Sequence, residues 1–344
     1  MTPLSLSHLH LLARATTDVF LDGHMAGNNL GNALANVIRH STCPETDRRG
    51  PPSPEHVASC PACWLLAAET NPGSVVRPYA VVGPRPPQTR VAPGQPFAFG
   101  LTLFGQALQF LPYVVVAAAE VGRVGVGRDR RDGQGRFRLE AIDSHNPFTG
   151  DTHRLLAPGD PVVHANPAVI TFDHIRPAAD RLRADLAQED NTLHLRFLSP
   201  TRLEEKDRLF RAPDFAVLFR RLLYRIDDLA RNFAGGARRD RAELDRLHAA
   251  ADRVRLVDCQ VHWVEQWSWS GRKESRTPVG GFVGTAAYRS DDWADLLPWL
   301  LLGQGTHVGK LPVKGNGVYE VAGRAEGYWA WAPPPLPSSL TPIP

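Results

Sequence analysis

Apolar side chains repeat with helical spacing in two long segments of the chain. In residues 27–39 they fall on one stripe, and in residues 213–233 they line one face of a strongly amphipathic segment. The stripe residues are Leu30, Leu34, Val37 and Ile38 in the first segment, and Phe215, Leu218, Phe219, Leu222, Leu223 and Ile226 in the second. The pattern therefore predicts two helices that each bury one face.

Shorter apolar or alternating runs predict strands, and they occur in the same order in both halves. Strand, helix, glycine-rich turn and strand follow one another over residues 97–142 and again over residues 282–321. The helices of these two repeats are expected at 106–121 and 293–302. Further strands are expected at 8–20, 192–203 and 260–269, and a further helix at 239–254. Strand–helix–strand repeated in this way is the ferredoxin-like pattern, so we expect an α+β fold with two tandem βαββαβ domains.

The predicted domains follow from this repeat. Residues 1–160 form an N-terminal ferredoxin-like domain, with a polar and proline-rich loop insertion at 41–96 that contains cysteines. Residues 161–331 form a C-terminal ferredoxin-like domain with a glycine-rich loop, and residues 332–344 are a proline-rich tail.

The composition is that of an ordinary globular protein with a slightly basic balance. The 344 residues are 43% hydrophobic, the formal net charge is +3 and the pI is near 8.8. The chain has no run of eighteen apolar residues, which predicts no membrane span. Four cysteines in so long a chain do not indicate a disulfide framework, so a reducing cytoplasm is the expected location.

The segment His307–Gly317 has the most informative local pattern. It combines Gly309, Gly315 and Gly317 with Lys310 and Lys314 just before the last strand. Glycine allows a close backbone approach and lysine supplies positive charge, so the segment suits the binding of a phosphate backbone. It lacks the spacing of a Walker A loop, and no helix follows it as a dinucleotide-binding turn would require.

Several phrases of the chain, taken in order, are similar to those of one family. They are Arg77-Pro-Tyr79, Leu101-Thr-Leu-Phe-Gly105, Leu198-Ser-Pro-Thr-Arg202, Gly280-Gly-Phe-Val-Gly284, and His307-Val-Gly-Lys310 with Gly315-Asn-Gly317. Together they resemble the CRISPR-associated endoribonucleases of the repeat-associated mysterious protein (RAMP) superfamily, which cut precursor CRISPR RNA within its repeats during antiviral defence. Lys314 and Leu311-Pro312 depart from the usual loop of that family, which leaves its detailed contacts open.

The resemblance implies a chemistry that needs no metal or other cofactor. The ribose 2′-hydroxyl attacks its own 3′-phosphate and leaves a 2′,3′-cyclic phosphate and a 5′-hydroxyl. The implied partners are CRISPR repeat RNA, the mature guide RNA that stays bound, and other CRISPR effector subunits. A non-catalytic RAMP-fold subunit that only binds guide RNA is the alternative, because a fold does not fix a function.

Histidine suits the proton transfers of such a reaction. The resemblance implies a catalytic histidine at or just past the first helix, where His40 lies. A helix C-terminus favours the imidazolium form of His40 and suits an acid, whereas His24, near the N-terminus of the same helix, suits a base. His40 is the first candidate and His24 the second.

The cysteines suggest a competing role for His40. His40-x2-Cys43 and Cys60-x2-Cys63 are two ligand pairs of the kind found in tetrahedral zinc sites, and His56 is an alternative fourth ligand. A structural zinc at Cys43, Cys60 and Cys63 would exclude His40 from proton transfer if His40 were the fourth ligand. The alternative is that Cys63, beside Trp64-Leu65-Leu66, is a small buried hydrophobic residue.

Basic residues outside the glycine-rich loop are the remaining RNA-binding candidates. Arginine pairs with phosphate through two hydrogen bonds and stacks on bases. The candidates are Arg123, Arg128, Arg130 and Arg131 around the first glycine turn, Arg272 and Lys273 after an aromatic strand, and His307, Gly309, Lys310, Lys314, Gly315 and Gly317 in the last loop. Trp263, Trp267 and Trp269 on that aromatic strand are expected to belong to the core.

Overall fold

A computed structural model of the protein describes residues 4–45, 52–66, 76–159, 162–188, 190–270 and 275–322. The chain divides into two compact units. The N-terminal unit comprises residues 6–146 and 150–169, and the C-terminal unit comprises residues 170–331 together with 1–5 and 147–149. The two units therefore meet in sequence at residues 169 and 170, whereas the predicted boundary lies after residue 160.

The N-terminal unit is built on a five-stranded antiparallel sheet in the order β3-β5-β1-β6-β7. Its elements are β1 (Leu6–Ala15), β2 (Val19–Phe20), η1 (Gly23–Met25), α1 (Ala26–Thr42), α2 (Pro54–Ser59), α3 (Pro61–Leu66), β3 (Tyr79–Val82), β4 (Arg90–Val91), β5 (Pro96–Phe104), η3 (Gly105–Phe110), α4 (Leu111–Val124), η4 (Arg130–Asp132), β6 (Phe137–His145) and β7 (Thr152–Leu156). The helices α1 and α4 pack against each other, and α4 also packs against β6.

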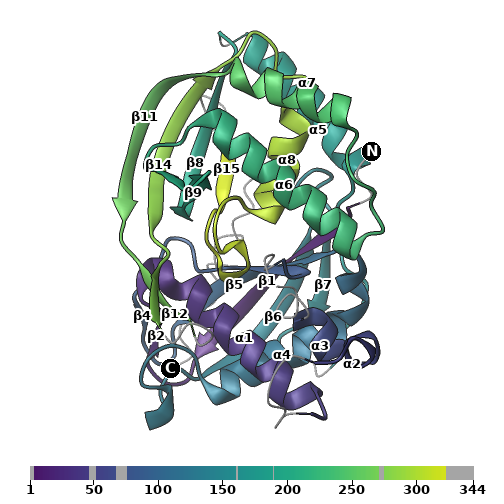
Figure 1. Cartoon of the computed structure of the whole chain (residues 1–344). Coiled ribbons are helices and arrows are strands. Elements are labelled where there is room, and N and C mark those ends of the chain that lie inside the picture. Colours follow the sequence, from purple (N-terminus) through teal and green to yellow (C-terminus); the bar gives the residue numbers. More distant parts are fainter. Residues whose placement is uncertain are drawn as a thin grey trace. The chain divides into compact units, whose positions relative to one another are not determined.

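The C-terminal unit is built on a four-stranded antiparallel sheet in the order β11-β14-β8-β15. Its elements are α5 (Phe172–Ala187), β8 (Thr192–Thr201), β9 (Leu203–Glu205), β10 (Arg208–Phe210), α6 (Phe215–Phe233), α7 (Arg241–Asp252), β11 (Arg255–Val264), β12 (Trp267–Ser270), β13 (Ser275–Pro278), β14 (Gly281–Arg289), α8 (Leu297–Thr306), η5 (Pro312–Lys314) and β15 (Tyr319–Ala322). The helices α6 and α8 lie side by side, and α8 contacts β15 (Figure 1).

Both units have the ferredoxin-like topology, which confirms the predicted fold. In the first, strand β1, helix α1, strands β3 and β5, helix α4 and strand β6 form the βαββαβ order, and β7 is added at one edge. In the second, the same order is β8, α6, β11, β14, α8 and β15. In each sheet the first strand lies between the third and the fourth, and the second strand lies outside the third.

The two amphipathic helices predicted from the sequence are present and bury the predicted faces. In α1 the stripe of Leu30, Leu34, Val37 and Ile38 is buried. In α6 the buried face begins beside Asp214, whose carboxylate caps the helix by accepting a hydrogen bond from the Val217 N–H (2.9 Å). The burial of one face, rather than helix propensity alone, therefore fixes both helices on their sheets.

Two regions predicted to be irregular contain regular elements. The supposed loop insertion at 41–96 includes β3, whose residues Tyr79–Val82 are fully buried and pair with β5. Residues 143–191, for which no helix or strand was predicted, include β7 and α5. The predicted strand at 260–269 is two strands, β11 and β12. The predicted tail at 332–344 lies outside the described residues.

One helical stretch, Gly105–Val124, is long and apolar enough to cross a membrane by length and composition alone. It comprises η3 and α4, and 44% of its most apolar 18-residue stretch is buried. Because α4 packs against α1 and β6, the stretch has the contacts of a core helix of this unit.

Candidate nucleic-acid interface

The glycine-rich loop between α8 and β15 is closed by a single backbone hydrogen bond. The Val308 N–H donates to the Gly317 carbonyl at 2.9 Å. Gly317 has φ +71°, and a Cβ there would lie 1.7 Å from the Val308 carbonyl oxygen. Gly309 has φ +83°, and a Cβ there would lie 2.5 Å from the Arg202 carbonyl oxygen. Only glycine fits these two positions, because side chains at either one would both strain and overlap the backbone.

The loop between α4 and β6 repeats this closure in the N-terminal unit. The Val126 N–H donates to the Gly135 carbonyl at 2.9 Å. Gly135 has φ +78°, and a Cβ there would lie 2.1 Å from the Val126 carbonyl oxygen. Gly127 has φ +83° and lies against the Phe20 carbonyl, where a Cβ would come within 1.9 Å. The two loops therefore have the same backbone conformation.

A side-chain hydroxyl fixes the exit of each loop in the same way. Thr17 Oγ1 accepts a hydrogen bond from the Arg136 N–H at 2.9 Å, immediately before β6. Ser199 Oγ accepts one from the Val318 N–H at 2.9 Å, immediately before β15. Because the hydroxyl satisfies the first N–H after the closing glycine, it sets the point at which each final strand leaves its loop.

The C-terminal loop is held from beneath by a buried arginine. Arg225 on α6 donates from its Nε to the Thr306 carbonyl, at the end of α8. Burial lowers the pKa of Arg225 to about 9, against the opposing effect of Asp228. A cation at the C-terminus of a helix is favourable, because the last carbonyls of the helix carry partial negative charge.

His307 lies inside this loop and does not reach its surface. The residue is 1% exposed, and its Nδ1 lies 3.1 Å from the Pro312 carbonyl oxygen. The expectation that its side chain contacts phosphate is therefore corrected, because the ring supports the loop from within.

The lysines of the C-terminal loop are only partly available to an anion. Lys310 Nζ lies 3.1 Å from a carboxylate oxygen of Glu204, which Arg202 also contacts. Burial raises the pKa of Glu204, but the hydrogen bonds from Arg202 and Lys310 outweigh it and leave the pKa lowered. Lys314 is half-buried. The positive charge of this loop is therefore shared with a neighbouring carboxylate.

The N-terminal loop has more exposed basic side chains, which alternate with Asp129 and Asp132. Arg130 and Arg131, in η4, are exposed, and neither forms an ion pair with any residue that the structure describes. Arg128 is exposed as well and lies over the Phe20 ring, with 4.5 Å between its guanidinium carbon and the ring centroid. Arg123, at the end of α4, pairs with Glu120 at 2.6 Å.

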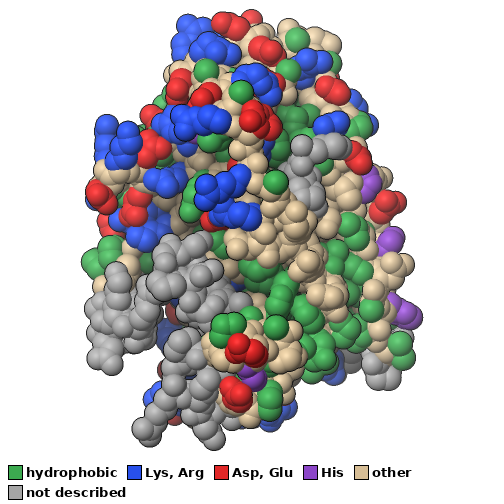
Figure 2. Space-filling view, turned by 45° about the vertical axis from the view of Figure 1, so that its right-hand side comes forward, with side chains coloured by type: hydrophobic (Ala, Val, Ile, Leu, Met, Phe, Trp, Pro, Cys, Tyr) green, Lys and Arg blue, Asp and Glu red, His purple; other side chains and the backbone are tan. Residues whose placement is uncertain are grey.

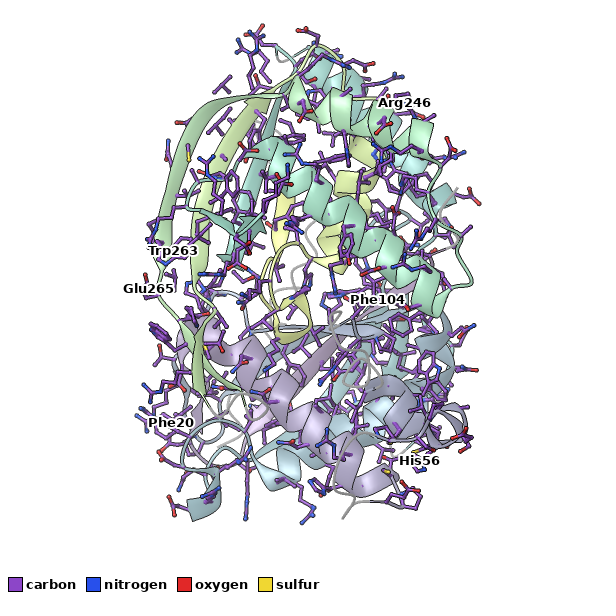
Figure 3. All side chains as sticks on the ribbon, viewed as in Figure 1. Phe20, His56, Phe104, Arg246, Trp263 and Glu265 are labelled. Atoms are coloured by element: carbon purple, nitrogen blue, oxygen red, sulfur yellow. The ribbon has the colours of Figure 1, made fainter. Side chains whose placement is uncertain are left out.

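The aromatic strand contributes a half-buried tryptophan and an exposed one. Trp263, on the edge strand β11 (Figure 3), lies beneath the guanidinium groups of Arg202 and Arg211, at 5.8 and 4.8 Å. Trp267 is 55% exposed, so the expectation that it belongs to the core is wrong. Arg272 and Lys273 lie outside the described residues.

The two candidate catalytic histidines lie at opposite ends of one helix. His24 is in η1, just before α1, and is half-buried, whereas His40 is exposed in the last turn of α1. A helix of 17 residues is roughly 25 Å long, given a rise of about 1.5 Å per residue. The two imidazoles therefore cannot act as acid and base at the same phosphate.

Two family models match the chain, and they divide it as the two units do. A family described as an N-terminal domain matches residues 4–168. The family described as CRISPR-associated endoribonuclease Cas6 matches residues 195–319, from β8 into β15. Residues 195–319 are therefore similar to the Cas6 endoribonucleases. No curated protein sequence matches it.

Solved structures with the same fold match almost all of this chain. A Cas6 product complex matches with a TM-score of 0.53 at 15% identity, over 92% of this chain and 99% of the other. Cas6 of Thermus thermophilus matches with 0.51 at 14% identity, over 92% and 98%. A partial Cas6-RT-Cas1–Cas2 complex matches with 0.56 at 14% identity, and the match covers 92% of this chain but 46% of that one. At these identities the matches establish the fold.

The sheet of the N-terminal unit contains a histidine cluster that the sequence did not reveal. His8 and His10 alternate along β1, and their ring centroids are 4.6 Å apart. His145, on β6, lies 6.1 Å from His10. Burial, and then the nearby His145, lower the pKa of His10 to about 4, so His10 is neutral near pH 7. Because His8 and His10 are both buried, they belong to the interior rather than to an RNA-facing surface.

A cavity of about 340 Å³ lies beside α6 and α7, and two of its arginines each pair with two carboxylates. Arg220 pairs with Glu205 and Asp252, and Arg239 pairs with Asp227 and Glu243. The surface over these helices, in the upper part of Figure 2, accordingly has basic and acidic side chains interspersed. A mixed surface of this kind gives little net attraction for a polyanion.

The predicted cysteine cluster forms, and His56 rather than His40 completes it. Cys43, Cys60 and Cys63 are buried near the end of α1 and around α2 and α3, and their sulfur atoms converge with the His56 ring (Figure 3). Burial raises the pKa of Cys43, but hydrogen bonds, first from the Glu45 backbone and then from His56 and the other two thiols, outweigh it and leave the pKa lowered.

We expect Gly317→Ala to destabilise the C-terminal unit far more than Gly235→Ala does. Both residues have positive φ, but nothing lies within 4 Å of a Cβ at Gly235. The conformational strain alone costs about 1 kcal/mol, whereas strain and overlap together cost at least about 3 kcal/mol at Gly317. Chemical denaturation of the two variants measures the difference, and equal losses would refute the role of the loop closure.

Proposed function

We propose that the chain is a metal-independent endoribonuclease that cuts precursor CRISPR RNA within its repeats. The match of residues 195–319 to the Cas6 endoribonuclease family is the observation that carries this proposal. The N-terminal glycine loop supports it, because exposed arginines on a closed turn suit a ribose-phosphate chain.

The proposed reaction is an internal transesterification. The 2′-hydroxyl of one ribose attacks the adjacent 3′-phosphate and loses its proton, a new O–P bond forms, and the bond to the 5′-oxygen breaks. The 5′-oxygen takes up a proton, which leaves a 2′,3′-cyclic phosphate and a 5′-hydroxyl. Holding the nucleotide in line and transferring the protons supply the rate enhancement.

His40 is the residue that we assign to proton transfer. It is exposed in the last turn of α1, where RNA can reach the ring, and an imidazole is the side chain best suited to transfer a proton to a leaving oxygen. Since His24 lies at the other end of α1, the second proton transfer falls to water or to another group.

Phosphate binding is the role that we assign to both glycine loops. In the N-terminal loop, Arg128, Arg130 and Arg131 are exposed on a rigid turn, and arginine holds phosphate through two parallel hydrogen bonds. In the C-terminal loop, Gly309, Gly315 and Gly317 allow a close backbone approach, and Lys310 and Lys314 add charge. We expect these phosphate contacts to retain the cut guide RNA, which other effector subunits would then bind.

Replacement of His40 tests the catalytic assignment. In buffer without added metal ions, we expect His40→Ala to slow the cleavage of repeat RNA by about 10²–10⁴-fold while leaving its binding unchanged. His24→Ala and the control His164→Ala, which removes another exposed histidine of the same unit, should cleave within a few-fold of wild type. End mapping should find a 2′,3′-cyclic phosphate.

Two results would contradict these assignments. Cleavage by His40→Ala at the wild-type rate would overturn the residue assignment and leave the reaction standing. Tight binding without any cleavage by the wild type would overturn the reaction and favour the non-catalytic guide-RNA-binding subunit.

Salt dependence tests the role of the N-terminal loop. We expect Arg130→Ala/Arg131→Ala to reduce the slope of log Kd against log salt concentration by about 1 to 2, because each phosphate contact contributes roughly 0.7 for single-stranded RNA. The control Arg241→Ala/Arg253→Ala removes the same charge from exposed positions on and just after α7 and should leave the slope unchanged. Equal slopes for the two double variants would show that the loop makes no phosphate contact.

A further inference from the structure

Three cysteines and one histidine of the N-terminal unit direct their ligand atoms to a common centre. The sulfur atoms of Cys43, Cys60 and Cys63 and a ring nitrogen of His56 all lie within 4.8 Å of one another. Cys43 Sγ is 3.4 Å from His56 Nε2 and 3.6 Å from Cys63 Sγ. The last distance is far longer than a disulfide bond of about 2.05 Å, so these two sulfurs are not covalently joined.

The spacing is that of a tetrahedral zinc site. With Zn–S bonds of about 2.3 Å and Zn–N bonds of about 2.0 Å, tetrahedral geometry separates two sulfurs by about 3.8 Å, and a sulfur and a nitrogen by about 3.5 Å. The two separations at Cys43 agree with these values. We propose that Cys43, His56, Cys60 and Cys63 bind one structural Zn²⁺ ion.

The surroundings of His56 support its role as a ligand. Its Nδ1 lies 3.1 Å from Glu45 Oε1, on the side of the ring away from the thiols. A carboxylate that accepts the Nδ1–H fixes the ring and leaves the Nε2 lone pair facing the metal, as in many carboxylate–histidine–zinc arrangements. Glu45 therefore acts as a positioning residue for this site.

The site is closed and suits a structural rather than a catalytic ion. Three thiolates and one imidazole fill the four positions of a tetrahedral ion and leave none for water or substrate. Each of the three cysteines is at most 6% exposed. Because thiols coordinate as thiolates, binding releases their protons and the affinity rises with pH.

The ion would join the end of one helix to two short ones. Cys43 directly follows α1, Cys60 lies between α2 and α3, and Cys63 is in α3. Helix α2 has no buried residue, so a metal cross-link supplies cohesion that its own packing does not. The zinc site is proposed from its own ligand geometry. It can therefore be tested separately from the proposed RNA cleavage.

Metal analysis of the purified full chain tests the site directly. We expect about one Zn²⁺ per chain to remain after dialysis, and Co²⁺ exchanged into the protein should show the visible spectrum of a tetrahedral thiolate site. Cys63→Ser and His56→Ala should lose the ion. Cys259→Ser, which removes the exposed cysteine of β11, and His40→Ala, which removes the histidine that the sequence also pairs with Cys43, should keep it.

Each outcome decides between the two ligand sets or refutes the site. Wild-type protein that binds no Zn²⁺, even when reduced and refolded with the ion, would overturn the proposal without requiring any variant to fold. Loss of the ion in His40→Ala, with retention in His56→Ala, would overturn the ligand set. A thermal midpoint that falls by several degrees on chelation of the wild type, and does not respond in Cys63→Ser, would support the structural role.

Discussion

The hydrogen bond from a valine N–H to the closing glycine of each loop is the constraint on which the rest of the structure depends. It brings the chain back to the end of the preceding helix, and a hydroxyl then takes the next N–H and directs the chain into the final strand. Without that closure, β15 would not enter its register on β8, and the lysines and glycines of the loop would not be held together. Both units use the same device, so the second loop is a structural copy of the first rather than an unrelated turn.

The copies differ in the chemistry that they present. The C-terminal loop is tightly held, with Arg225 beneath it, His307 inside it and Lys310 beside Glu204, so it provides shape more than charge. The N-terminal loop carries exposed arginines on the same backbone. A duplicated scaffold thus offers one side-chain-poor surface and one cationic surface, and a long ribonucleotide chain can use both kinds of contact.

The sequence predicted the periodic elements and the order of the two repeats, but it missed what depends on burial in three dimensions. The stripe of α1 and the face of α6 were predictable because apolar spacing reports a buried face directly. The short strand Tyr79–Val82 was hidden by flanking prolines, although its pairing with β5 overrides that signal. The burial of His307 was not predictable, since a histidine beside glycines and lysines reads as an exposed binding residue.

The structure distinguishes His40 from His56 as the fourth zinc ligand, which the spacing in the sequence could not do. In sequence, His40 and His56 are both plausible fourth ligands beside three cysteines, and a metal role for His40 would forbid proton transfer by it. In the structure His56 completes the buried cluster, whereas His40 stays exposed in the last turn of α1. A metal ion that holds Cys43, just past that turn, would fix the helix end that carries His40 and leave its imidazole uncoordinated. The zinc site and the catalytic histidine can therefore lie at the same end of α1, because His56 is the metal ligand and His40 transfers the proton.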